Sequence, residues 1–107
     1  YNLFVSNAFS PEFGAPGVRF FKPTGIGLAT YHLYIYDTWG NLIWETDQLI
    51  NSEPAVGWDG RDMAGNTMPQ DTYVWKISAT FLDGSIWPGK IFPDSSVKRY
   101  GTVTLMR

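Results

Sequence analysis

Short runs in which apolar and polar residues alternate make up most of this chain, and Gly, Pro, Asn or Asp separates one run from the next. Alternation with a period of two residues is typical of β-strands, whose successive side chains point to opposite faces of a sheet. Apolar stripes with the 3.6-residue period of a helix are nearly absent. The sequence therefore predicts an all-β fold whose strands are joined by turns and loops.

Two long segments have the clearest strand patterns. In Thr72–Phe81, aromatic and apolar residues alternate with polar ones, which predicts one buried and one exposed face. Thr30–Asp37 has apolar residues on both faces, as expected of a central strand with one side in the core and the other under a loop or a partner. A turn joins it to Asn41–Thr46, and Gly40 supplies the positive φ that such a hairpin turn needs.

The remaining strands are expected to be shorter or interrupted by proline. We place them at Leu3–Phe9, Val18–Lys22, Ser85–Phe92 and Tyr100–Met106, with an extended loop at Asp47–Ala55. About seven or eight short strands with regular turn signals predict an immunoglobulin-like antiparallel β-sandwich. Residues 1–107 are expected to form a single domain, and the start at Tyr1 without Met is typical of a fragment or a processed product.

Composition and charge narrow the choice of partner. The chain has 107 residues, of which 44% are hydrophobic, and no Cys, so a hydrophobic core and not disulfides must hold it together. The net charge of −2 makes nucleic acid a poor partner, and no apolar run is long enough for a membrane-spanning helix. The charge is sorted along the chain, because residues 37–83 are acidic and residues 90–107 are basic.

Candidate chemistry is sparse, and we expect no enzyme, no metal and no cofactor. His32 is the only histidine, it lies within a predicted strand, and there is no Cys for a thiol nucleophile or a Cys–His metal site. Asp59 and Asp62 are close enough in sequence to suggest paired carboxylates or a calcium site. Asp-rich turns are more often only turns, because Asp side chains bond to their own backbone.

Five Trp residues leave a sugar-stacking platform open as an alternative function. Trp75 belongs to the alternating strand and is expected in the core, while Trp39 and Trp58 lie in turns where a large ring can close the end of the sandwich. Trp44 and Trp87 are the two that look free to be exposed. A carbohydrate-binding or adhesive module would use this pair.

Five stretches, taken in order, resemble the C-terminal sorting domain of the type IX secretion system of Bacteroidetes, type B, also called the gliding-motility-associated C-terminal family. The stretches are Ser6–Pro11, Leu33–Thr46, Gly57–Gly60, Pro69–Ile77 and Gly101–Arg107. The positions expected to carry the family's fold are Asn7, Ala8, Phe9, Tyr36, Trp39, Gly40, Trp58, Asp59, Gly60, Tyr73, Trp75, Val103 and Leu105.

The chain departs from the family pattern in three places. The loop Glu12–Gly17 replaces one rich in Asn, Gly and Asp that looks suited to a cation, so no metal is expected there. Asp71 stands where the family commonly has Gly, and we expect it in a turn with positive φ at some cost. The segment Ile86–Lys98 is longer than usual.

The resemblance implies a non-catalytic addressing domain that directs a cargo protein through the outer-membrane translocon to the cell surface or the medium. Its implied partners are the periplasmic and outer-membrane secretion machinery and the cargo domains that precede it. We expect Tyr100–Arg107 to be the recognition element, because an edge strand with nearby positive charge can accept a partner strand. The residues expected to bind the partner are Lys98, Arg99, Tyr100, Gly101, Thr102, Thr104 and Arg107.

Overall fold

The computed structural model describes residues 1–11 and 19–106, and its regular elements are all β-strands, as the sequence predicts. They are β1 (Asn2–Phe4), β2 (Ala8–Phe9), β3 (Thr24–Ile26), β4 (Leu28–Tyr36), β5 (Leu42–Thr46), β6 (Leu49–Ile50), β7 (Glu53–Pro54), β8 (Asp71–Phe81), β9 (Lys90–Ile91), β10 (Val97–Lys98) and β11 (Tyr100–Leu105). No helix in the described part of the chain is long and apolar enough to cross a membrane.

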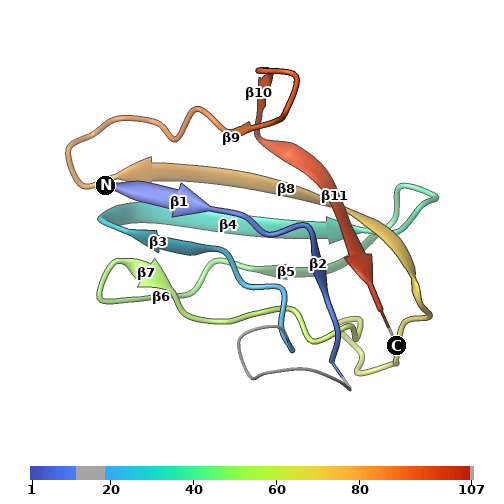
Figure 1. The fold of residues 1–107 in the computed structure, drawn as a ribbon. Coiled ribbons are helices and arrows are strands. Elements are labelled where there is room, and N and C mark those ends of the chain that lie inside the picture. The colour runs from blue at the N-terminus through green and yellow to red at the C-terminus, as the bar shows by residue number, and fades with distance from the viewer. Residues whose placement is uncertain (12–18, 107) are drawn as a thin grey trace.

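A five-stranded sheet with the order β2-β11-β8-β4-β5 forms the main body of the fold (Figure 1). Its long central strands β4 and β8 are antiparallel, with Leu33 opposite Ile77. The expectation of a purely antiparallel sheet is wrong at one edge, because β2 runs parallel to β11 with Ala8 opposite Thr104. The preceding strand β1 pairs with β3 in another sheet, so a crossing between sheets and not a hairpin sets the direction of β2.

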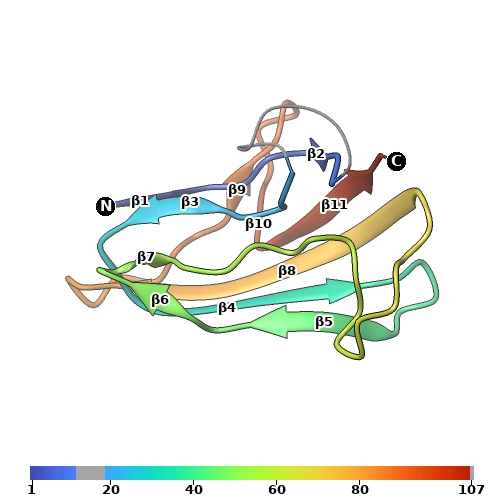
Figure 2. The ribbon, with the colours of Figure 1, turned by 90° about the horizontal axis from the view of Figure 1, so that it is seen from below.

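Short strand pairs cover one face of the main sheet. Figure 2 shows β1 and β3 in a second layer above β8 and β4, with β6 and β7 beside them. The core lies between the layers. Buried aromatic and aliphatic side chains from both layers meet there: Val5, Phe9, Phe21, Leu33, Ile35, Trp58, Tyr73, Trp75, Ile77, Val103 and Leu105. Burying such side chains is the main stabilising contribution in a domain that has no disulfide.

The alternation in the two long strands predicts their faces correctly. In β8, the side chains from Tyr73 to Phe81 at every second position are buried, and the residues between them are more exposed. In β4, His32, Tyr34 and Tyr36 lie on the outer face and stack along the strand, with ring centroids 4.0 Å and 6.4 Å apart. No described segment crosses this outer face in Figure 2, so the loop expected over it is not there.

Several predicted strands have different bounds. Leu3–Phe9 divides into β1 and β2, because the chain passes from one sheet to the other around the buried Val5. Val18–Lys22 begins outside the described residues, and within its described part only Phe21 pairs, in a single bridge to Trp58. The next strand, β3, starts after Pro23.

Two loop expectations are also corrected. Asp47–Ala55 contains the hairpin β6–β7, whose turn residues Asn51 and Ser52 both have positive φ. Two consecutive positive φ angles are typical of a two-residue hairpin turn, which the sequence usually marks with Asn-Gly or Asp-Gly. Here Ser takes the place of Gly, so the sequence does not mark the turn. Asp71 does not have a positive φ, because it is the first residue of β8 and has extended backbone.

The region after β8 folds back only briefly. Ile86 forms a bridge to Thr80, as the predicted pairing of Ser85–Phe92 requires. The chain then leaves β8, and β9 pairs instead with β10, a strand that the sequence pattern does not predict. Pro88, which lacks a backbone N–H, lies where the pairing with β8 ends.

Candidate partner-recognition surface

Strand β11 lies between β8 and the very short β2, so most of its second edge has no strand partner. Pairing with β2 involves only Thr104 and Leu105. In an antiparallel ladder the backbone groups of alternate residues point to alternate sides. Because Arg99 O accepts the Ile77 N–H, the N–H and C=O of Tyr100 and Thr102 point away from β8. These groups form an open edge to which a further strand can bind.

The side chains of β11 divide between the two faces of the sheet. Val103 and Leu105 are fully buried, as expected for core residues, while Tyr100, Thr102 and Thr104 are exposed on the outer face. Gly101 is half-buried on the inner face, and its contact with a partner stays a prediction. A Cβ atom there would lie 2.9 Å from Trp75 Cζ2 and 3.1 Å from Phe92 Cζ, so Gly101 leaves room for these two rings.

Basic side chains gather beside the start of β11. Lys90 and Lys98 are directly opposite each other in the β9–β10 ladder, and their Nζ atoms lie 5.6 Å and 5.9 Å from the Phe92 ring centroid. Lys98 Nζ is also 5.9 Å from the Tyr100 ring centroid. Arg99 Nε donates a hydrogen bond of 3.0 Å to Trp87 O, which holds its guanidinium in place. We call Lys90, Lys98 and Arg99 the basic cluster.

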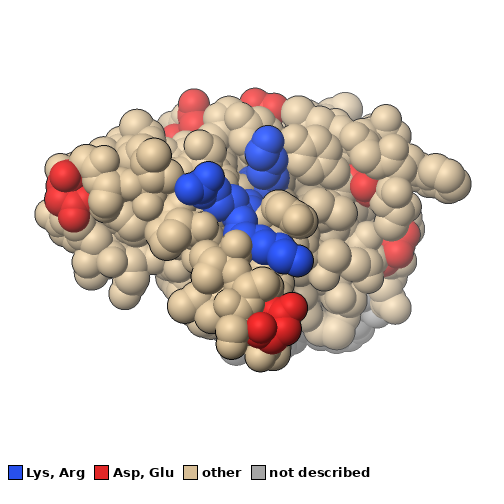
Figure 3. Space-filling view, turned by 90° about the horizontal axis from the view of Figure 1, so that it is seen from above, with Lys and Arg blue, Asp and Glu red and all other residues tan. Residues whose placement is uncertain are grey.

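Among residues 1–11 and 19–106, no carboxylate lies at ion-pair distance from the basic cluster. Figure 3 shows basic side chains near the middle of the face seen from the β9–β10 end, with acidic side chains farther out. Among the described residues, the one ion pair within 4.0 Å joins His32 and Glu45, on the outer face of the main sheet. The pKa of Asp94, in the loop between β9 and β10, is lowered first by the hydroxyl and backbone N–H of Ser96 and to a smaller extent by the charge of Lys98.

A groove of about 510 Å³ lies between the segment Phe4–Asn7 and the segment Lys90–Pro93. Phe4, Ile91 and Phe92 give it apolar walls, while Asn7 and Lys90 give it polar groups. Lys90 Nζ donates a hydrogen bond to Asn7 Oδ1. We call this space the β11-side groove, because Asn7 O accepts the Thr104 N–H and Phe92 lies against Gly101.

Several motif positions outside β11 have mainly structural contacts. Phe9 is buried with its ring centroid 5.2 Å from that of Trp58, whose own Nε1 donates a hydrogen bond of 2.8 Å to Arg61 O. The Tyr73 hydroxyl donates a hydrogen bond of 2.7 Å to Pro69 O. Ala8 is half-buried in β2, and Gly60 has a φ of 85°.

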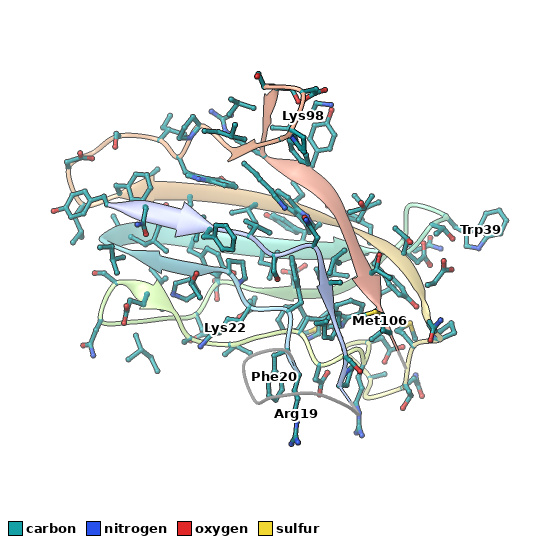
Figure 4. All side chains as sticks on the ribbon, in the orientation of Figure 1. Arg19, Phe20, Lys22, Trp39, Lys98 and Met106 are labelled. Atoms are coloured by element: carbon teal, nitrogen blue, oxygen red, sulfur yellow. The ribbon has the colours of Figure 1, made fainter. Side chains whose placement is uncertain are left out.

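Trp39 contradicts the expectation that it closes one end of the fold. Its side chain is 87% exposed and projects away from the body at the tip of the β4–β5 hairpin (Figure 4). The turn beneath it is well ordered by hydrogen bonds, because Asp37 Oδ1 accepts the N–H groups of Trp39 and Asn41. Gly40 has a φ of 82°, as the sequence predicts.

The sugar-stacking pair expected from the sequence does not form. Trp87 is only 4% exposed and packs in the core, with its ring centroid 6.5 Å from that of Trp75. Trp44 is half-buried against the core. The sequence left Trp87 free to be exposed, but Trp87 N donates to Ala79 O of β8 and the ring packs in the core.

The candidate catalytic residues have structural partners. Asp62 accepts the N–H groups of Ala64 and Asn66, which lowers its pKa, and Asp59 accepts the Arg61 N–H. His32 Nε2 is 3.2 Å from Glu45 Oε1 on an exposed sheet face. No group of three or more His, Cys, Asp or Glu side chains that could hold a metal occurs in the described residues.

The structure thus brings Lys98, Arg99, Tyr100, Thr102 and Thr104 to one region of the surface, while Arg107 lies outside the described residues. Sequence reasoning missed the contribution of Lys90 and Phe92, which reach this region only through the pairing of β9 with β10. The one available signal was the basic character of residues 90–107 as a whole.

Comparisons with known proteins found no protein similar to this chain. No family model matches the chain, and no curated protein or solved structure matches it significantly.

Proposed function

We propose that this chain is a non-catalytic sorting domain that directs the protein carrying it through the type IX outer-membrane translocon to the cell surface or the medium. The sequence support is the ordered set of five motif stretches from Ser6–Pro11 to Gly101–Arg107. The observation that carries the proposal is the open edge of β11 at Tyr100 and Thr102, next to the basic cluster. The partners are the secretion machinery, which reads this edge, and the upstream cargo domains.

We also propose that the two layers form an immunoglobulin-like β-sandwich. Two features support this finer description. The buried Tyr73 near the start of β8 donates its hydroxyl to the backbone four residues upstream, as the tyrosine corner of immunoglobulin-like domains does. Trp75, buried in the middle of the core, supplies a central aromatic ring of the kind that such domains use.

The test of the proposed function is an export assay. A reporter enzyme fused ahead of Tyr1 is expressed in a bacterium that has a type IX system, and reporter activity is measured at the cell surface, in the medium and in the periplasm. We expect the fused reporter to leave the periplasm and the unfused one to remain there. Export of neither, or of both equally, would contradict the proposed function.

Point variants test the surface better than a truncation, because removing β11 also removes the buried Val103 and Leu105. The double variant Lys98→Gln with Arg99→Gln should reduce export severalfold. Lys22→Gln with Arg61→Gln removes the same charge from exposed positions elsewhere and should leave export unchanged. Equal export by both double variants would remove the basic cluster from the mechanism.

A second variant addresses the strand edge. Because the Thr102 N–H points away from β8, Thr102→Pro removes an outward donor without removing a bond of the β8–β11 ladder. If the machinery adds a strand at this edge, export should fall while circular dichroism still reports a folded domain. Full export by folded Thr102→Pro would show that backbone pairing at this position is not used.

A further inference from the structure

We infer that the β11-side groove binds an extended peptide segment that carries a carboxylate beside an apolar side chain. The inference names the chemistry of the partner, and it rests on the proposed function for its biological setting. Three features support it: the apolar walls of the groove, the open strand edge of β11 next to it, and basic side chains that have no carboxylate within ion-pair distance among the described residues.

The open edge explains why the occupant is extended. Both ends of the open stretch of β11 adjoin the groove, since Phe92 lies against Gly101 and Asn7 bonds to Thr104. The groove is lined by residues 4–7 and 90–93, so a peptide that extends from the groove toward β11 reaches the outward N–H and C=O groups of Tyr100 and Thr102. These groups offer main-chain hydrogen bonds to an extended chain, whatever its side chains are.

The apolar walls explain why one side chain of the occupant is apolar. Ile91 is 74% exposed and Phe4 is 67% exposed, and both line the groove. A ligand that covers these exposed apolar side chains removes their surface from water, which favours binding. The groove volume of about 510 Å³ accommodates a few side chains of a short segment.

The basic cluster explains why the occupant carries a carboxylate. Lys90 and Lys98 are directly opposite each other, an arrangement that destabilises a strand pair because like charges repel. No carboxylate of the described residues lies within ion-pair distance of either side chain. A carboxylate bound between them would relieve this repulsion, and Arg99 lies next to Lys98 to add a third positive charge.

Titration calorimetry with the 107-residue chain tests the inference. The probe is a blocked pentapeptide of alternating valine and glutamate, and the control probe is its valine–lysine counterpart. We expect the acidic peptide to bind, the basic peptide not to bind, and the backbone amide resonances of Tyr100 and Thr102 to shift in NMR spectra with the acidic peptide. Equal binding of the two peptides, or absence of binding by the acidic one, overturns the inference.

Variants locate the binding site. Lys90→Gln should weaken acidic-peptide binding about fivefold, which corresponds to roughly 1 kcal/mol. Lys22→Gln removes the same charge from an exposed position that does not line the groove and should have no effect. Ile91→Asp places a carboxylate at an exposed groove position, so it should abolish acidic-peptide binding without unfolding the domain. Equal effects of Lys90→Gln and Lys22→Gln would contradict the assignment to this groove.

The binding and export assays can fail separately. If the acidic peptide binds as described but the fused reporter stays in the periplasm, the proposed function fails and the peptide site stands. If the reporter is exported but the acidic peptide does not bind, the peptide site fails and the sorting role stands.

Discussion

Three buried polar atoms among the described residues have no hydrogen-bond partner, namely Ser10 Oγ, the Tyr31 hydroxyl oxygen and Trp75 Nε1. Buried polar groups are usually paired, because an unpaired group loses its hydration and gains nothing in return. Burial also raises the pKa of the Tyr31 hydroxyl well above its usual value of about 10. The core therefore tolerates these three unpaired polar atoms, because the packing around them compensates for the free energy that their lost hydration costs.

We predict that Tyr31→Phe stabilises the domain by about 1 kcal/mol, because it removes an unpaired hydroxyl and keeps the buried ring. Tyr73→Phe is the matched control, since the Tyr73 hydroxyl bonds to Pro69 O at 2.7 Å. Its loss should destabilise the domain by about 1 kcal/mol. Urea unfolding measures both values, and a loss of stability in Tyr31→Phe would show that its hydroxyl is paired in solution.

Gly101→Ala is predicted to destabilise the domain by about 1 to 3 kcal/mol through overpacking. The added methyl group would lie 2.9 Å from Trp75 Cζ2, and both Trp75 and Phe92 would have to shift. Thr102→Ala, at the exposed neighbouring position, should change the free energy of unfolding by much less. Equal effects in urea unfolding would contradict the inward position of Gly101.

At the level of secondary-structure elements, two of the loops that connect strands have the same hydrogen-bonded structure. Asp37–Asn41 and Asp62–Asn66 share the pattern Asp-x-x-Gly-Asn, and in both the first Asp accepts the backbone N–H of the second and fourth residues that follow. The Asn side chain of each loop also donates to the same Asp. These contacts are local in sequence, so each loop's conformation is specified by residues within the loop itself.

We predict that Asp37→Ala lowers the melting temperature more than Asp47→Ala does. Asp37 accepts two backbone N–H groups of its loop, whereas Asp47 accepts only the adjacent Gln48 side-chain amide. Thermal unfolding followed by circular dichroism measures the difference. Equal melting temperatures would show that the loop bonds contribute nothing to stability.

Trp39→Ala should leave the free energy of unfolding within about 0.5 kcal/mol of wild type, because the ring is 87% exposed and contributes little to the core. The same variant should retain the far-ultraviolet circular dichroism of the wild type. A marked loss of stability in urea would mean that the indole packs against the domain in solution.

Acid sensitivity is a property of the whole molecule, because four carboxylates spread along the chain share one mechanism. Side-chain and backbone donors lower the pKa values of Asp37, Asp62, Asp83 and Asp94, mainly Asn41, Asn66, Ser85 and Ser96 respectively. A lowered pKa in the folded state contributes stability that is present above the unfolded value and lost as the pH falls through the folded value.

We therefore predict a melting temperature that is nearly constant between about pH 5 and pH 7 and falls below about pH 4, where these carboxylates take up protons. Calorimetric scans from pH 2 to pH 7 measure the profile. The quadruple Asp→Asn variant should be less stable at pH 7 and should show a shallower fall in acid. The same slope in wild type and variant would assign the acid sensitivity to other groups.

Local and distant interactions explain which expectations succeeded. The faces of β4 and β8 follow from the sequence because alternation depends only on the backbone geometry of one strand. The positive φ of Gly40 is likewise a property of one turn. The β6–β7 hairpin and the strand β10 were missed because segments of two residues are too short to show a period.

By itself, the sequence determined that this chain has an all-β fold and which residues of its two long strands face inward, since neighbouring residues alone specify those features. Only the tertiary structure decided that Trp87 is buried and Trp39 exposed, because burial depends on which distant segments cover a side chain. It also placed Lys90 opposite Lys98 beside an edge of β11 that β2 leaves open. That arrangement joins segments far apart in the chain, so no local pattern could reveal it.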